Sequence, residues 1–140
     1  MKQIHVSAAI IRNGGEILCM QRGENRYSYV SRKFEFPGGK IEPGETPEEA
    51  LLRELREEMD YTVEIERPFM TIEHDYPDFH ITLHTFLCKA SSREFNRKEH
   101  LSHCWLAPEK MTELEWAPAD RPAVERLAGE WTAGEWTAGE

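Results

Sequence analysis

The feature that most constrains this chain is the run IEPGETPEEALLRELREEMDY, which carries a full set of local helix signals. Thr46 is a residue type that caps helix N-termini, and Pro47 suits the first helical position. Glu49, three residues after Thr46, completes a capping box. We therefore predict a helix from 47 to 59 that ends near Asp60.

Glutamates gather on one side of this predicted helix. At about 100° per residue, Glu54, Glu57 and Glu58 fall in one stripe beside an apolar stripe. Like charges three and four residues apart destabilise a helix by a few tenths of a kcal/mol per pair, so something outside the helix should compensate. A hard divalent cation such as Mg²⁺ binds carboxylates gathered in this way. A solvated charged face is the alternative. The apolar stripe consists of Leu51, Leu52, Leu55 and Met59.

The segment before the helix, FPGGKIEPGE, favours the metal interpretation. Its two adjacent glycines let the backbone approach a ligand closely. Lys40 can serve as a point charge for phosphate, and Glu45 lies beside the start of the helix. Alone, GGK reads as a plain loop. Together with the glutamate stripe, it indicates a site for a metal and a phosphate.

The rest of the chain alternates strands with helices, which predicts an α/β fold with helices packed on a mixed sheet. Asn13-Gly14-Gly15 is a tight-turn signal between two strands, and a second turn is expected at 76–78. A final helix is expected near PADRPAVERLAGE. We assign one domain to residues 1–128. The repeat AGEWT then marks a C-terminal tail, 129–140, as a helix extension or a frayed end.

Charge and cysteines limit the partners and the compartment. The formal charge is −9, from 26 acidic and 17 basic side chains, which argues against a nucleic-acid polymer or an anionic membrane as the main partner. No apolar run is long enough to span a membrane, and the N-terminus does not read as a signal peptide. Cys19, Cys88 and Cys104 read as buried thiols in a reducing compartment, so we expect a cytoplasmic protein.

Residues 39–61 resemble the Nudix box, in which fixed glycine, glutamate and arginine positions recur. One position departs, since Asp60 stands where the family has glycine. The resemblance covers roughly residues 3 to 128 and extends to the MutT-like and CTP pyrophosphohydrolase-like branch. It implies a Nudix α/β/α sandwich and hydrolysis of a nucleoside triphosphate to the monophosphate and pyrophosphate. The matching positions are Gly39, Glu45, Arg53, Glu54, Leu55, Glu57, Glu58 and Tyr61.

The resemblance also implies a catalytic and metal-binding set. Mg²⁺, or Mn²⁺ as a substitute, would be bound by the Gly39 carbonyl, Glu54, Glu57 and Glu58. Glu54 is the first choice for the base, and Glu45 is its orienting partner. Arg53 would hold the glutamates in place by ion pairing. Glu99 matches an acidic position used in the family as an extra ligand or base, and a solvated loop acid is the alternative.

The base-binding pocket is expected between Tyr76, Asp120 and Phe36, with Arg22 and Lys40 at the phosphates. Relatives that prefer oxidised guanine carry Asn where this chain has Asp120. An ionised Asp only accepts hydrogen bonds, which suits the cytosine amino group and favours CTP, dCTP or 5-substituted dCTP. Asp120 as an N-cap of the last helix is the alternative.

Two other functions remain open at this point: 8-oxo-dGTP hydrolysis and a non-catalytic Nudix-like base-binding module. A Nudix enzyme for another diphosphate is a further possibility. The expected partner is a small nucleotide, and the expected assembly is a monomer or a homodimer.

Overall fold

The tight turn expected near the N-terminus joins the first two strands. A computed structural model of the protein describes residues 1–132, with the backbone alone for 131–132. Strand β1 (Lys2–Asn13) pairs antiparallel with β2 (Glu16–Gln21). Gly14 and Gly15 lie between them at φ 63° and 84°, conformations that glycine adopts without the steric cost of a Cβ.

The centre of the sheet is a parallel pair of strands. β1 runs alongside β6 (Phe79–Lys89) from Lys2↔Phe79 to Arg12↔Lys89. β6 in turn pairs antiparallel with β5 (Glu64–Asp75), and the two are joined by the turn expected at 76–78. The sheet is therefore mixed, as predicted.

Three short strands complete the sheet, in the order β3-β2-β1-β6-β5 with β4 on β1 and β7 on β2. β3 (Phe34–Glu35) and β7 (Ser102–Leu106) both flank β2. β4 is the stretch Gly38–Lys40, paired with Val6 to Ala8 of β1. The interpretation of GGK as a plain loop is wrong, because pairing with β1 draws this stretch into the sheet.

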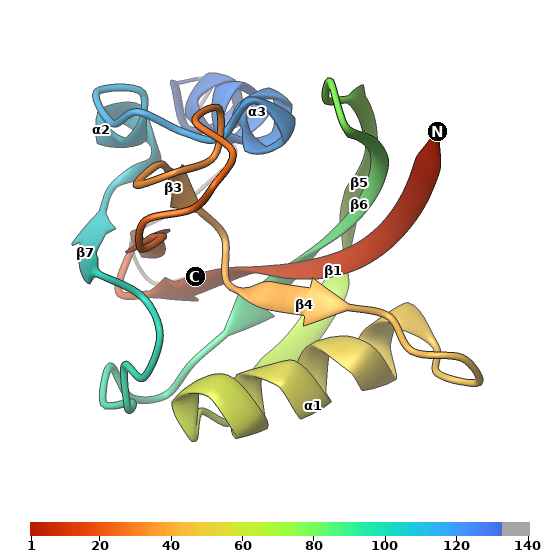
Figure 1. Ribbon diagram of the computed structural model, residues 1–140. Coiled ribbons are helices and arrows are strands. Elements are labelled where there is room, and N and C mark those ends of the chain that lie inside the picture. Colours follow the sequence, from red (N-terminus) through yellow and green to blue (C-terminus); the bar gives the residue numbers. More distant parts are fainter. Residues whose placement is uncertain (133–140) are drawn as a thin grey trace.

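Helices lie on both faces of the sheet (Figure 1). α1 (Pro47–Met59) covers one face beneath β1 and β4, and α2 (Pro108–Met111) and α3 (Arg121–Thr132) lie across the other. A 3₁₀ turn, η1 (Pro118–Asp120), leads directly into α3. This arrangement confirms the predicted α/β/α fold class. α3 continues the chain four residues past 128 into the expected tail, whose residues 133–140 lie outside the described part.

α1 forms as its sequence signals predict. The Thr46 side chain accepts a hydrogen bond from the Glu49 N–H, and the Glu49 side chain accepts one from the Thr46 N–H, so the capping box is complete. The helix ends at Asp60, which takes the left-handed conformation at φ 49°. Leu51, Leu55 and Met59 are buried. Leu52, assigned to the same apolar stripe, is 38% exposed, so that assignment is wrong.

Two hydrophobic clusters flank the sheet. The cluster on the α1 face contains Ile11, Leu18 and Phe86 together with Leu51 and Leu55 of α1. The cluster on the other face contains Ile10, Leu83 and, from α3, Ala123, Val124 and Leu127. Within residues 1–132, none of the helices is both long and apolar enough to cross a membrane.

Gly38 sits where no side chain fits. A Cβ at this position would lie 1.9 Å from the Ser7 backbone oxygen of β1. We expect Gly38→Ala to lower the free energy of unfolding by about 3 kcal/mol or more, because the β1–β4 pairing must shift. Urea unfolding followed by circular dichroism measures this change.

The matched control is Gly129→Ala on α3, where an added Cβ meets no heavy atom of the described residues within 4 Å apart from its chain neighbours and its own helix backbone. That substitution should raise the free energy of unfolding by roughly 0.5–1 kcal/mol, since alanine favours the helix. Equal stability of the Gly38→Ala variant and the wild type would contradict the close approach of β4 to β1.

Candidate active site

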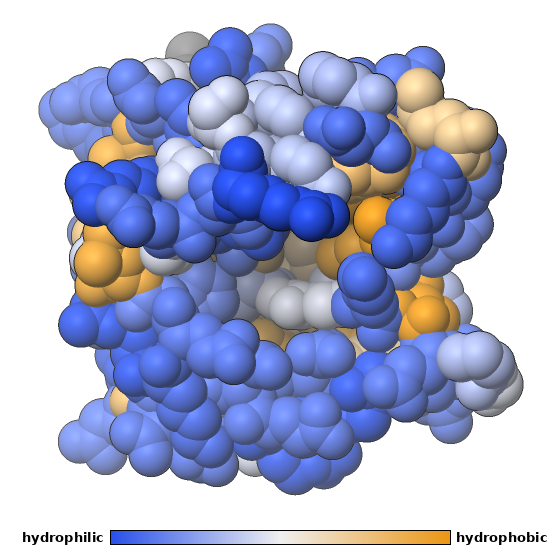
Figure 2. Space-filling view, in the orientation of Figure 1, coloured by the Kyte–Doolittle hydropathy of each residue, from blue (hydrophilic) through white to orange (hydrophobic). Residues whose placement is uncertain are grey.

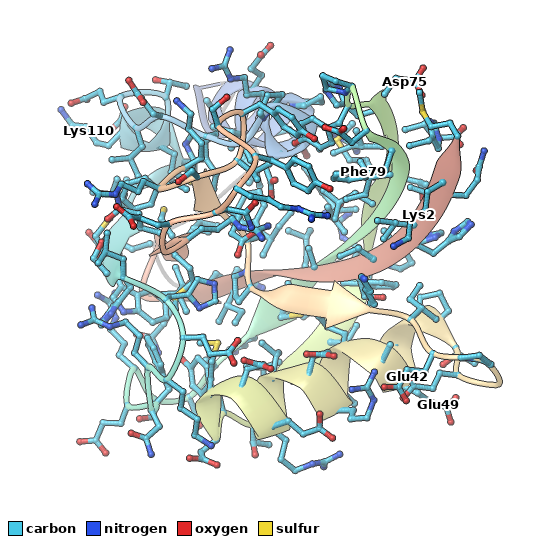
Figure 3. All side chains as sticks on the ribbon, in the orientation of Figure 1. Lys2, Glu42, Glu49, Asp75, Phe79 and Lys110 are labelled. Atoms are coloured by element: carbon cyan, nitrogen blue, oxygen red, sulfur yellow. The ribbon has the colours of Figure 1, made fainter. Side chains whose placement is uncertain are left out.

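A cavity of about 590 Å³ runs across the molecule between its two layers of helices. α1 and β4 line one end of the cavity, and segment 22–27 with η1 lines the other. Figure 2 shows a hollow across the middle of this face, with a mostly hydrophilic rim and hydrophobic side chains deeper in and at one end. Figure 3 labels Lys2 and Phe79, the first residues of β1 and β6, and both line the cavity.

The α1 end of the cavity is acidic. Glu54 and Glu58 line it, together with Gly39 of β4 and Glu99 of the loop before β7. A Cβ on Gly39 would stand 2.3 Å from the Glu54 carboxyl carbon. Glycine at position 39 therefore lets a carboxylate lie directly against the backbone of β4.

Arg53 compensates for the crowding of the glutamates. Its Nε and Nη2 donate to both oxygens of Glu45 at 2.6 and 2.9 Å. Its Nη1 donates to Glu54 Oε1 at 3.0 Å and to Glu57 Oε2 at 3.2 Å, and Nη2 also reaches the Lys40 carbonyl. A planar guanidinium has enough donors for this arrangement, and one ammonium group does not.

Glu45 is the most strongly held carboxylate of this group. Hydrogen bonds from Arg53 lower its pKa to about 2, with a smaller contribution from the Glu42 N–H. Glu45 thus anchors Arg53 from the loop before α1, and Arg53 in turn fixes Glu54.

Glu58 and Glu99 form a second acidic pair. Burial raises the pKa of Glu58, and a hydrogen bond to Glu99 and the charge of that carboxylate raise it further. The raised pKa favours the neutral form of Glu58 beside Glu99. A divalent cation bound at this end would favour the ionised form of Glu58.

The chemistry of these residues suits a hard divalent cation, but their side chains are not yet arranged around a single point. The donors are carboxylate oxygens, which Mg²⁺ prefers. Within residues 1–132, no three acidic, His or Cys side chains already stand in ligating geometry. Glu57 lies apart from the set, because its side chain is 60% exposed, pairs with Arg53 and does not line the cavity.

The opposite end of the cavity is built around Asp120. Its side chain is buried, and Oδ1 accepts a hydrogen bond from the Phe36 N–H at 3.1 Å. The Tyr76 hydroxyl accepts a hydrogen bond from the Ala119 N–H at 3.0 Å, so Tyr76 holds η1 in place. Phe36 is also buried and packs against Trp116, with ring centroids 4.9 Å apart.

Burial changes the chemistry expected of Asp120. Desolvation raises the pKa of this carboxyl well above its ordinary value, and the nearby charge of Glu35 raises it further. Burial therefore favours the neutral acid, which donates one hydrogen bond and accepts others. An ionised Asp120 that only accepts hydrogen bonds, as expected from the sequence, does not fit this environment.

Two residues that sequence reasoning missed link the two ends of the cavity. Glu35 accepts from Arg22 Nη1 at 3.2 Å, and its other oxygen lies 3.0 Å from His100 Nε2. All three residues line the cavity. The hydrogen bond to Glu35 therefore orients the guanidinium of Arg22, which was expected at the phosphates. Lys40, by contrast, is exposed at the rim.

A stack of aromatic rings, also missed, stands beside the cavity, which Tyr27 and Tyr76 line. Tyr29 stacks on Tyr76 with ring centroids 4.8 Å apart, and Tyr27 stacks on Tyr29 at 5.4 Å. The Tyr29 hydroxyl donates to Asp78 Oδ2 at 2.7 Å. This bond ties segment 22–33 to the β5–β6 turn. The spacing RYSY was the available sequence signal.

Comparison with known proteins points to one family. The family described as NUDIX domain matches residues 1–127. An 8-oxo-dGTP diphosphatase of Escherichia coli (strain K12) is 37% identical over 91% of this chain and 98% of the relative. A CTP pyrophosphohydrolase of the same organism is 35% identical over 89% of this chain and 91% of the relative. The crystal structure of a MutT protein from Methanosarcina mazei Go1 superposes with a TM-score of 0.80 at 28% identity, covering 92% of this chain and 95% of that one.

The Glu45–Arg53 pair predicts how stability responds to acid. Because the pKa of Glu45 is lowered from 4.5 to about 2, its stabilisation is present above pH 4.5 and is lost as the pH falls through 2. The melting temperature of Glu45→Gln should therefore lie below that of the wild type above about pH 5.5. The two should converge toward pH 2.

Glu42→Gln is the matched control, since Glu42 is 64% exposed and 3.7 Å from Arg53. Its melting temperature should stay close to that of the wild type at every pH, because exposed pairs contribute little. A pH-independent difference for Glu45→Gln would contradict the role of its charge.

Proposed function

Because the chain belongs to the Nudix family of nucleotide pyrophosphohydrolases, we propose that it hydrolyses a nucleoside triphosphate to the monophosphate and pyrophosphate. CTP, dCTP or 5-substituted dCTP is the proposed substrate. The observation that carries this proposal is a single cavity with acidic residues at one end and a buried hydrogen-bonding group at the other. Such a cavity suits a molecule with a phosphate chain on one side and a base on the other.

At the acidic end, the proposed cofactor is Mg²⁺, with Mn²⁺ as a substitute. Gly39, Glu54, Glu58 and Glu99 would hold it, and Glu57 would join only after leaving Arg53. When bound, such a cation supplies charge neutralisation on the phosphates and a lowered pKa for a bound water. Lys40 at the rim is the proposed additional contact for phosphate.

Glu54 is the proposed base. Arg53 holds its Oε1 at 3.0 Å, and its Oε2 lies on the side of Gly39. Arg53 therefore fixes Oε1, while Oε2 lies beside Gly39 in the cavity lining. A carboxylate oriented in this way suits removal of a proton from an attacking water. Glu45 acts on this step indirectly, because it positions Arg53. Glu99 is proposed as an extra ligand or a second base.

At the other end, Asp120 is proposed to read the base. As a neutral acid it offers an O–H donor next to its carbonyl acceptor. Cytosine presents an acceptor, N3, beside its N4 amino donor, and this pair matches the acid. Tyr76 and Phe36 are proposed to shape this end mainly by packing. Arg22 contacts Glu35, which lines the same cavity.

The burial of Asp120 also favours a second candidate, 8-oxo-dGTP. Oxidised guanine presents an N–H at the 7 position beside the O6 acceptor, so it matches a neutral acid as well. Unmodified guanine presents two acceptors at that edge, and one O–H can satisfy only one of them. Asp120 thus disfavours guanine while allowing both candidates.

The setting of the reaction is part of the same proposal. We place the protein in the cytoplasm, because its cysteines are free thiols and reducing compartments keep thiols in that state. The proposed partner is a small nucleotide and not a nucleic-acid polymer, in keeping with the net charge of −9. A monomer or a homodimer remains the prediction for the assembly.

The direct test is turnover of equal amounts of CTP, dCTP, 5-methyl-dCTP and 8-oxo-dGTP with Mg²⁺, resolved by chromatography. We expect a monophosphate and pyrophosphate from the cytidine nucleotides, and no turnover after chelation of the metal. Glu54→Gln should reduce kcat at least about 100-fold, since a general base contributes 10²–10⁴-fold. Glu42→Gln, which changes an exposed charge outside the cavity lining, is the control.

Preferred turnover of 8-oxo-dGTP would keep the reaction and replace the substrate. No turnover of any of the four, or equal turnover by the Glu54→Gln variant, would refute the proposed reaction. Binding without turnover would instead support a base-binding module.

The protonation of Asp120 has its own test. Asp120→Asn keeps a donor beside an acceptor, so its kcat/KM at pH 7 should stay within about threefold of the wild type. Asp120→Ala should lose about 10- to 100-fold, since it removes both hydrogen bonds to the base.

A pH series provides the control. The raised pKa of Asp120 predicts that the wild type loses kcat/KM relative to Asp120→Asn as the pH rises through that pKa. If the ionised carboxylate is instead the binding form, Asp120→Asn will be as impaired as Asp120→Ala at pH 7.

A further inference from the structure

Two cysteines far apart in the sequence face each other across neighbouring strands. In the antiparallel pair of β2 and β7, Cys19 lies directly opposite Cys104. Both side chains contribute to the hydrophobic cluster on the α2 and α3 face, whereas Trp105, the next residue along β7, packs with the cluster on the α1 face. The two thiols therefore project from the same face of the sheet.

The positions of these strands satisfy the geometry of a disulfide. Residues directly opposite each other in an antiparallel pair have Cα atoms about 4.5–5.5 Å apart. Disulfides join Cα atoms about 4.4–6.8 Å apart. The register of β2 and β7 thus places Cys19 and Cys104 within the range of Cα separations that a disulfide spans.

The two thiols differ in access and in acidity. Cys19 is fully buried, whereas Cys104 is half-buried on a strand whose one partner within residues 1–132 is β2. The neighbouring Cys19 thiol lowers the pKa of Cys104 to about 7. Cys104 therefore provides an accessible thiolate near neutral pH, and the thiolate is the form that reacts with oxidants.

The third cysteine provides a contrast within the same protein. Cys88 is fully buried in the cluster on the α1 face, and burial raises its pKa to about 12. It lies on β6, next to β1 and β5 and away from β2 and β7. A buried thiol of this kind is inert.

We propose that Cys19 and Cys104 are a site of oxidative modification, at which a hydroperoxide forms a reversible disulfide between β2 and β7. With hydrogen peroxide, the Cys104 thiolate attacks one oxygen. An S–O bond forms, the O–O bond breaks, and the other oxygen leaves as hydroxide, which takes the proton released by Cys104 to become water. The Cys19 sulfur then attacks Cys104, the S–S bond forms, and the sulfenic oxygen leaves with the Cys19 proton as a second water. Two thiols are oxidised and one peroxide is reduced.

The cross-link would fix β7, the strand that follows the loop containing Glu99, to β2. β7 begins directly after this loop, and its start is already held to β2 by the Leu101 N–H to Gln21 carbonyl bond at 2.8 Å. The Ser102 hydroxyl adds a bond to Gln21 Oε1 at 2.6 Å. A covalent bond two residues further along would make β7 unable to separate from the sheet. A thiol reductant would restore the two free thiols.

The test treats the full-length protein with hydrogen peroxide at pH 7 and counts thiols before and after. We expect two of the three thiols to disappear, together with the mass of two hydrogen atoms, and both changes to reverse with dithiothreitol. Non-reducing tryptic mapping should link NGGEILCMQR, residues 13–22, to EHLSHCWLAPEK, residues 99–110. Trypsin places Cys88 on a separate peptide, so the assignment is unambiguous.

Two variants separate the pair from the third cysteine. Cys88→Ser should still form the cross-link, whereas Cys104→Ser should lose no thiols. Oxidation should raise the melting temperature of the wild type by about 5 °C or more, because the disulfide closes a long loop of the unfolded chain. The wild-type peptide map tests the cross-link directly, even if either variant folds poorly.

Three results would overturn the proposal. The first is sulfinic or sulfonic acid on Cys104 without a linked peptide. The second is a disulfide between two copies of the chain, and the third is retention of all three thiols. Each of these results is independent of whether the protein hydrolyses nucleotides.

Discussion

The close approach of β4 to its neighbours is the constraint on which the rest of this structure depends. Gly38 lies against the backbone of β1, and Gly39 lies against the carboxylate of Glu54, at separations that exclude a Cβ. The first contact sets the distance between β4 and β1, and the second sets the distance between β4 and α1. The acidic end of the cavity lies where β4 meets α1. The absence of side chains at Gly38 and Gly39 therefore determines where the carboxylates stand.

Charge balance within α1 follows from the same geometry. A helix with glutamates three and four residues apart loses stability unless a cation lies nearby. Here Arg53 supplies that charge from within the helix, and Glu45 holds the guanidinium from the preceding loop. The protein is thus stable with part of its acidic cluster already neutralised. Glu58 stands instead beside Glu99, and burial and that neighbouring carboxylate raise the pKa of Glu58.

Local signals predicted more of this molecule than long-range contacts did. The bounds of α1 and the turn at Asn13-Gly14-Gly15 were predictable, because capping and turn residues act within a few positions. β4 was not, because two glycines read as a loop until β1 pairs with them. The same holds for the site: the acidic stripe followed from helix periodicity, whereas the protonation of Asp120 depends on burial and the partners of Arg22 depend on tertiary contacts.

The parallel pairing of β1 with β6 has a consequence for how the protein folds. The strands that form the floor of the cavity come from residues 2–12 and 79–89, so the central pairing joins distant parts of the chain. Such contacts require closure of a long loop before they contribute stability, which slows folding. During synthesis, β1 must wait for β6 to leave the ribosome. Until then the apolar side chains of β1 lack the neighbour that covers them in the finished sheet, and an unpaired strand of this kind favours aggregation.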